Sequence, residues 1–105
     1  RYSKMGNARA KASETYHAGI TVAMQQNPLK AEKLLSDAEK IQRELNDKLA
    51  LANTLLFKGK VSVPLKRRDN LIACFTEGIS ILKAMGMESR AAQSRQELDY
   101  YLRMN

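Results

Sequence analysis

The sequence is poor in the residues that build disulfides, metal centres and catalytic sites. It has one cysteine and one histidine in 105 residues, which excludes an internal disulfide framework and leaves too few ligands for a zinc site. A chain of this kind is typical of a reducing compartment, so we expect it to be cytoplasmic. The motifs of zinc proteases, serine hydrolases, phosphate loops and dinucleotide-binding folds are also missing. The sequence therefore predicts no enzyme, no metal, no cofactor and no small-molecule substrate.

Long apolar runs and strand patterns are equally scarce. No run approaches the roughly 20 apolar residues that span a bilayer, and the first ten residues lack the apolar core of a secretory signal. The segment KVSVPL alternates briefly, but Pro64 and the lack of a second strand argue against a sheet. We predict an all-α antiparallel bundle of four to five helices, forming one domain over residues 1–105. Because the sequence begins at Arg1, we expect it to be a domain or fragment of a longer chain.

Capping residues and apolar spacing mark the first half of the chain as helical. Asn7 is predicted to cap a first helix, and Asn27 followed by Pro28 to start a second. From there, apolar residues recur every three or four positions up to a predicted stop at Gly59. The only weak point is Asn46-Asp47, so the stretch is either one long helix or two helices with a tight break.

The second half gives a similar pattern. Ser62 is a candidate cap for the next helix, whose apolar stripe ends at Gly86. Met87 follows that glycine and is expected to fold back onto the last turn, as in a Schellman cap. A final helix is predicted over residues 89–103. Leu45 and Phe75 are predicted to be buried in the core.

Four residues in the first half follow a spacing seen in a known repeat family. Gly19, Ala31, Leu35 and Ala38 fall where tetratricopeptide-repeat helix pairs place a small residue on the first helix and small, large and small residues on the second. This stretch resembles one such repeat. The resemblance implies a helical hairpin array that binds peptides or partner helices.

The continuation of that resemblance is weaker. About 33 residues on, Ala52 takes the place of Gly19, and Gly59 matches the glycine between the two helices of a repeat. Pro64 and Arg68 then occupy packing positions, and the match as a whole covers about 60 residues. A plain helical bundle is the preferred interpretation.

The net charge of +7 is concentrated in two stretches. Residues 1–26 hold four basic residues against Glu14 alone, including Arg9 and Lys11, and residues 58–70 hold five against Asp69 alone. The five are Lys58, Lys60, Lys66, Arg67 and Arg68. If one long helix joins the two stretches, they meet at one end of the bundle. That end is predicted to contact an anion or an acidic partner.

Two binding functions remain open. In the first, the chain is a protein-interaction module or self-associates, and Leu49, Leu51 and Leu56 form an apolar stripe that a second chain covers. In the second, the basic end grips nucleic-acid phosphates. Few aromatic residues lie near the basic cluster, Tyr2 being the only one close by, and no nucleic-acid-binding motif is present. Protein interaction is therefore the preferred hypothesis.

Overall fold

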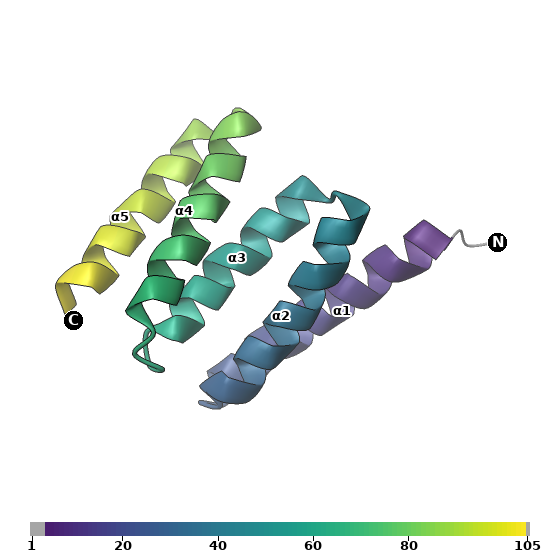
Figure 1. The fold of residues 1–105 in the computed structure, drawn as a ribbon, viewed down its shortest axis with the longest axis horizontal. Coiled ribbons are helices and arrows are strands. Elements are labelled where there is room, and N and C mark those ends of the chain that lie inside the picture. The colour runs from purple at the N-terminus through teal and green to yellow at the C-terminus, as the bar shows by residue number, and fades with distance from the viewer. Residues whose placement is uncertain (1–3, 105) are drawn as a thin grey trace.

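The computed structural model describes residues 4–104, with side chains from residue 6 onward, and folds them into five α-helices joined by short turns (Figure 1). No strand occurs within this range, which confirms the all-α prediction. Tyr2 lies outside the described residues. The helices are α1 (Lys4–Met24), α2 (Pro28–Leu45), α3 (Lys48–Ser62), α4 (Arg68–Ala84) and α5 (Glu88–Met104).

The four turns share one construction and one spacing. Each contains a residue in the left-handed region, and these residues follow one another at equal intervals: Gln26, Asn46, Lys66 and Gly86, with φ of 62°, 56°, 57° and 77°. Around Gly86, the amide of Met87 donates to the Leu82 carbonyl at 2.8 Å and that of Gly86 to the Lys83 carbonyl at 3.0 Å. The other three turns repeat this pair of bonds. All four are therefore Schellman caps, as predicted for Gly86 and Met87.

The helix boundaries confirm one predicted start and correct two others. The Asn27 side chain accepts a hydrogen bond from the amide of Lys30 at 3.4 Å, and Pro28 opens α2 as expected. Asn7 lies inside α1 and is not its cap. Ser62 is the last residue of α3, whereas α4 begins at Arg68. The predicted cap at Ser62 is therefore wrong.

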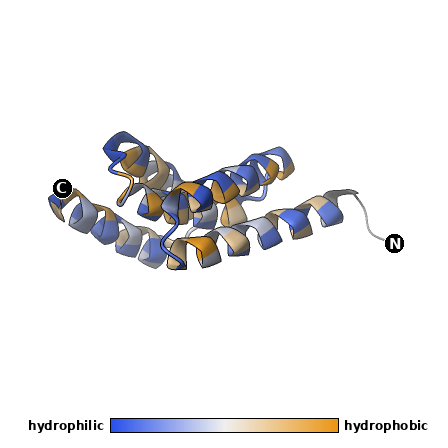
Figure 2. Cartoon of the chain, turned by 90° about the horizontal axis from the view of Figure 1, so that it is seen from below, coloured by the Kyte–Doolittle hydropathy of each residue, from blue (hydrophilic) through white to orange (hydrophobic). Residues whose placement is uncertain are grey.

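The break at Asn46-Asp47 is real, and it decides the topology. Asn46 tolerates the left-handed conformation better than most residues do, so the chain reverses there and α3 runs antiparallel to α2. Each helix packs mainly on the one before it and the one after it. In Figure 2, α1 and α5, which end at the N and C labels, lie along the lower side of the molecule. The described chain measures 49 × 33 × 18 Å, which is about two helix diameters deep.

The predicted burial is confirmed for Phe75 but is wrong for Leu45. Phe75 is fully buried, whereas Leu45 is only half-buried at the end of α2. The buried stripe of α2 runs through Ala31, Leu35, Ala38 and Gln42. Leu34, Ile41 and Leu45, which also recur at helical spacing, lie to one side of this stripe and are half-buried.

Two close helix contacts recur at equivalent places in successive helical hairpins. A Cβ built on Gly19 of α1 would lie 3.0 Å from Leu35 of α2, and one built on Gly59 of α3 would lie 2.5 Å from Phe75 of α4. The prediction that Gly59 ends a helix is therefore wrong. Gly59 lies inside α3 and lets two helices approach closely. The helical hairpin repeats with the interval from Gly19 to Gly59. The sequence-based match placed the equivalent of Gly19 at Ala52, and this shorter repeat interval is wrong.

This contact predicts a specific stability defect. Changing Gly59 to Ala should lower the free energy of unfolding by about 1–2 kcal/mol, because overpacking against the buried Phe75 ring outweighs the gain in helix propensity. Chemical denaturation would measure it. In the double mutant with Phe75→Leu, the loss should be smaller than the sum of the single losses. Gly19→Ala, whose Cβ would lie 3.0 Å from Leu35 and not 2.5 Å from an aromatic ring, is the matched control and should lose less. A fully additive double mutant would contradict the contact.

Candidate protein-binding groove

The leucines predicted to contact a partner divide between core and surface. Leu51 and Leu56 are buried inside the chain, with 4% and 7% of their surface exposed. Leu51 packs with Leu55 and Cys74, and Leu56 belongs to the main core cluster. Only Leu49 stays accessible, at 39% exposed. The predicted stripe of α3 is therefore covered by the chain itself, which corrects its assignment as a docking face.

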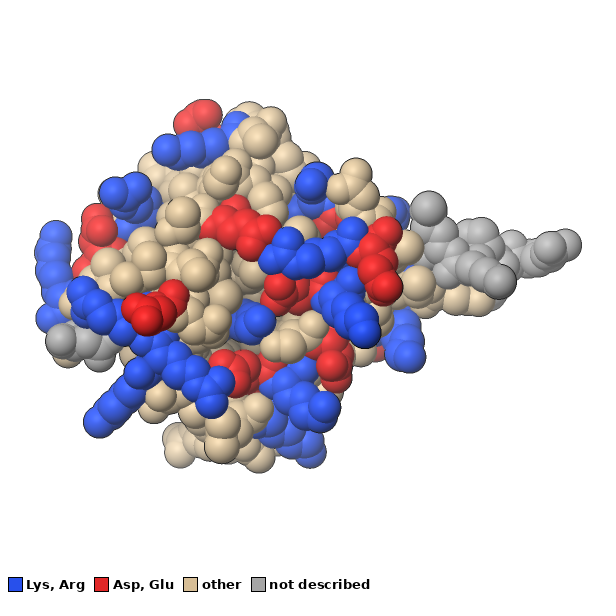
Figure 3. All heavy atoms as spheres, viewed as in Figure 1, with Lys and Arg blue, Asp and Glu red and all other residues tan. Residues whose placement is uncertain are grey.

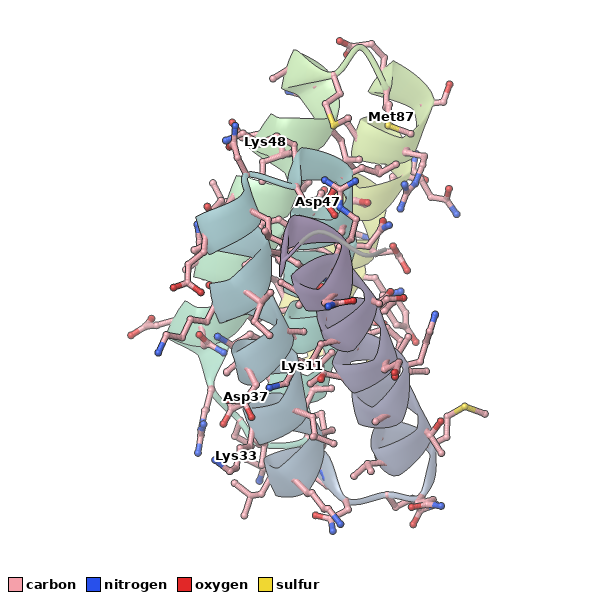
Figure 4. The ribbon with its side chains drawn as sticks, turned by 90° about the vertical axis from the view of Figure 1, so that its right-hand side faces the viewer. Lys11, Lys33, Asp37, Asp47, Lys48 and Met87 are labelled. Atoms are coloured by element: carbon pink, nitrogen blue, oxygen red, sulfur yellow. The ribbon has the colours of Figure 1, made fainter. Side chains whose placement is uncertain are left out.

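The two basic stretches lie at opposite ends of α3. Arg9 of α1 forms an ion pair with Asp47 at 3.3 Å, beside the turn where α3 begins. Figure 4 shows Asp47 and Lys48 at that end, together with Met87, and Lys11 further down α1 on the side facing α2. Residues 58–68 are at the other end of α3. The expectation of one shared basic end is wrong, because it assumed an unbroken second helix.

Three of the five basic residues between 58 and 68 are paired with acids of other helices. Lys58 contacts Glu39 at 2.9 Å, Lys60 contacts Glu97 at 3.4 Å, and Arg67 hydrogen-bonds Glu32. Lys66 and Arg68 are exposed and form no ion pair within the described chain. Most of this stretch is therefore neutralised from within the fold.

Part of this pairing belongs to a polar network that joins three helices. Arg43 of α2 donates two hydrogen bonds of 2.7 Å to the Glu77 carboxylate of α4 and one of 2.9 Å to Glu39. Glu39 also accepts from Lys58 of α3. The bond to Arg43 lowers the pKa of Glu77 and raises that of Arg43. Figure 3 shows the resulting mixture of basic and acidic side chains on the face that includes α2.

A groove runs along the opposite side of α3, between α1 and α5. It consists of three adjoining hollows of about 290, 220 and 520 Å³. The first two share Tyr16 and Asn53, and the last two share Phe57 and Lys60. We call this surface the α3 groove: α3 forms its floor, and α1 and α5 contribute to its walls.

The middle of the α3 groove is polar and held by cross-helix contacts. Arg90 of α5 donates a hydrogen bond of 2.7 Å to Asn53 Oδ1 of α3. Burial raises the pKa of Tyr16 of α1, and the nearby Arg90 charge partly offsets this rise. Lys60 lies 5.8 Å from the centre of the Phe57 ring and pairs with Glu97. Hydrogen-bond donors, a cation and aromatic rings are therefore available side by side.

One end of the α3 groove is apolar. The 520 Å³ hollow lies between the α1–α2 turn and the end of α3, with Lys60 at its edge. Its volume is of the size that holds a peptide side chain or a small ligand. Its apolar lining comes from Ala23, Pro28, Phe57, Val61 and Pro64.

Sequence reasoning named three residues that line this groove, Arg9, Leu56 and Lys60, and missed the others. The available signal was the spacing of Asn53, Phe57 and Lys60, which puts polar and aromatic side chains on one helical stripe. That stripe was overlooked because the leucines of the same segment dominated the pattern. Tyr16 and Arg90 reach the groove through the folding of distant helices, which no local spacing reveals.

The single histidine of the chain lines the α3 groove, and its single cysteine belongs to a core cluster. His17 is exposed, and its ring packs against Tyr16 at 5.3 Å. No group of three potential metal ligands occurs in residues 4–104. Cys74 is buried away from the groove, and burial raises the pKa of its thiol.

Among the described helices, none is both long enough and apolar enough to cross a membrane.

Comparison with family models, with curated proteins and with solved structures yields no match for this chain.

The network around Arg43 predicts a pH-dependent contribution to stability. The pKa of Glu77 is lower in the folded chain than its ordinary value of 4.5. The stability that the ionised carboxylate contributes is therefore fully present above pH 4.5 and is lost as the pH falls through the lowered pKa. Glu77→Gln should cost about 0.5–1 kcal/mol at pH 7, since the pair is partly exposed. Urea denaturation at pH 7 and pH 3 measures this.

The control is Glu44→Gln on α2, which removes the same charge from an exposed carboxylate and should change the free energy of unfolding by less than about 0.5 kcal/mol. A deficit of the Glu77 variant that is as large at pH 3 as at pH 7 would contradict the electrostatic origin.

Proposed function

We propose that the chain is a non-catalytic protein-interaction module that binds a peptide segment of a partner in the α3 groove. The observation that carries this proposal is the continuity of the three hollows along α3 through Tyr16, Asn53, Phe57 and Lys60. A peptide recognised there would place an apolar side chain in the 520 Å³ hollow and polar groups against Asn53 and Arg90. Such a division between an apolar anchor and oriented polar contacts is usual in ligand sites.

The charge of the chain favours an acidic segment. Lys60 lines both the apolar hollow and the polar middle of the groove. Lys66 and Arg68, which follow α3 in the chain, have no acidic partners among the described residues. With a net charge of +7, the chain also attracts acidic partners at a distance. A carboxylate next to the anchor residue of the peptide would compete with Glu97 for Lys60.

The fold is compatible with a tetratricopeptide-like array, but the period differs. Helical hairpins stacked in sequence leave a groove lined by alternate helices, here α1, α3 and α5. The interval from Gly19 to Gly59 is longer than the period of tetratricopeptide repeats and lies closer to the HEAT and armadillo range. We infer a helical-repeat module in the broad sense.

Nucleic-acid binding is the less favoured function. Phosphate contacts need free cations, and Lys58 and Arg67 are already paired with acids. The two basic stretches are also separated by the length of α3. We therefore expect a 20-base-pair DNA or RNA duplex to bind more weakly than about micromolar at physiological salt.

Panning a random linear peptide library against the immobilised chain tests the groove. Enriched peptides should combine an aromatic or large aliphatic residue with Asp or Glu. Their affinity, measured by fluorescence anisotropy, should fall about tenfold or more on Lys60→Glu, because a reversed charge repels the carboxylate.

The matched control is Lys33→Glu on the exposed side of α2, which makes the same charge change away from the groove. The proposal is contradicted if the enriched peptides bind the Lys60→Glu variant as tightly as they bind the unmodified chain. Tight binding of the duplexes would reverse the ranking of the two functions.

A further inference from the structure

A second groove, between α4 and α5, is separate from the α3 groove. It has a volume of about 450 Å³, and none of its lining residues is shared with the α3 groove. Ile72 at its rim is 36% exposed, whereas Ile79 and Leu98 below are almost buried. Leu102 is half-buried, and Lys83 is exposed. We call this surface the α4–α5 groove.

The hairpin repeat shows what an equivalent groove holds. Shifting the chain by the interval from Gly19 to Gly59 matches each residue of this groove with a residue of the preceding hairpin. On α4, Ile72 corresponds to Glu32, Ile79 to Glu39 and Lys83 to Arg43 of α2. On α5, Leu98 corresponds to Lys58 and Leu102 to Ser62 of α3. The equivalent surface is therefore the junction of α2 and α3. There, α4 packs along α3 and forms side-chain hydrogen bonds with α2.

The way α4 occupies that junction is specific. Phe75 lies over Gly59, Glu77 takes both hydrogen bonds from Arg43, and Asn70 donates to Ser62 Oγ at 2.7 Å. One helix thus contacts α3 through an apolar residue and a side-chain amide, and α2 through a carboxylate. No helix among residues 4–104 occupies the corresponding place on α4 and α5.

Compared with the α2–α3 junction, the α4–α5 groove exchanges polar for apolar side chains. The polar positions Glu32, Glu39, Lys58 and Ser62 become Ile72, Ile79, Leu98 and Leu102. Ile79 and Leu98 are already buried, so the apolar surface that water still reaches comes from Ile72 and Leu102. Covering these two side chains with a matching apolar face gains free energy.

The charges that remain favour an acidic occupant. Lys83 stands in the place of Arg43, which holds the Glu77 carboxylate of the seated helix. Arg95 also lines the groove and makes only a long contact, 3.9 Å, with Asp99. A second copy of this chain is disfavoured because each copy carries a net charge of +7.

We propose that the α4–α5 groove docks an amphipathic helix of a partner protein, with large apolar residues three and four positions apart and a carboxylate facing Lys83. The helix packs along α5 and places its carboxylate against α4, as α4 packs along α3 and places Glu77 against α2. Asp99 replaces Gly59 at this site, so the docked helix has a small or polar residue where α4 has Phe75.

A library of short helix-stabilised peptides, displayed on phage and panned against the full chain, tests this assignment. We expect enriched peptides with an i, i+3, i+4, i+7 apolar stripe and one essential Glu or Asp. Ile72→Asp and Lys83→Glu should each weaken binding about tenfold or more. Changing the essential Glu of the peptide to Lys should weaken binding to the unmodified chain and restore it on the Lys83→Glu variant.

Lys60→Glu is the matched control, because it alters the α3 groove and should leave helix binding unchanged. In turn, Lys83→Glu should leave the linear peptides of the α3 groove unaffected, so the two proposals fail separately. Thermal denaturation establishes that the variants remain folded. The inference is overturned if no helical binder is enriched, if binding ignores both Ile72→Asp and Lys83→Glu, or if sedimentation shows that a second copy of the chain occupies the groove.

Discussion

The rest of the structure depends on the spacing of its left-handed turn residues. Each Schellman turn reverses the chain within a few residues, and the equal intervals between the turns give α2, α3 and α4 nearly equal lengths. Helices of equal length, joined by tight reversals, pack side by side with their ends in register. The hairpin period follows directly, because two such intervals return the chain to the same direction.

The sequence predicts the helices themselves, and it marks a turn where a residue at the turn is a typical helix cap or a typical left-handed residue. Asn27-Pro28 and Gly86-Met87 were recognised because their residue types match the conformation they adopt. Lys66 was not, since lysine has no particular preference for a positive φ and is held there by the surrounding bonds. The start of α4 was therefore placed too early.

Gly59 shows why a correct residue preference led to a wrong boundary. Glycine is common just after a helix, and that statistic favoured a stop at this position. The structure uses another property of glycine, the lack of a Cβ, to bring the backbone of α3 against the Phe75 ring. Such a role depends on a residue of the next helix, and the local pattern contains no trace of it. For the same reason the acid partners of Lys58 and Arg67 were not foreseen.

The two grooves share α5 but use different faces of it. Arg90 and Glu97 face α3, whereas Leu98 and Leu102 line the α4–α5 groove. Apart from its packing on α4, α5 is held toward α3 by polar contacts such as those of Arg90 with Asn53 and Lys60 with Glu97. These contacts are partly exposed and individually weak. The packing of α5 on α4 therefore sets the width of the α3 groove. For that reason the surface that fixes α5 in place is as important to the proposed peptide binding as the residues that line the groove.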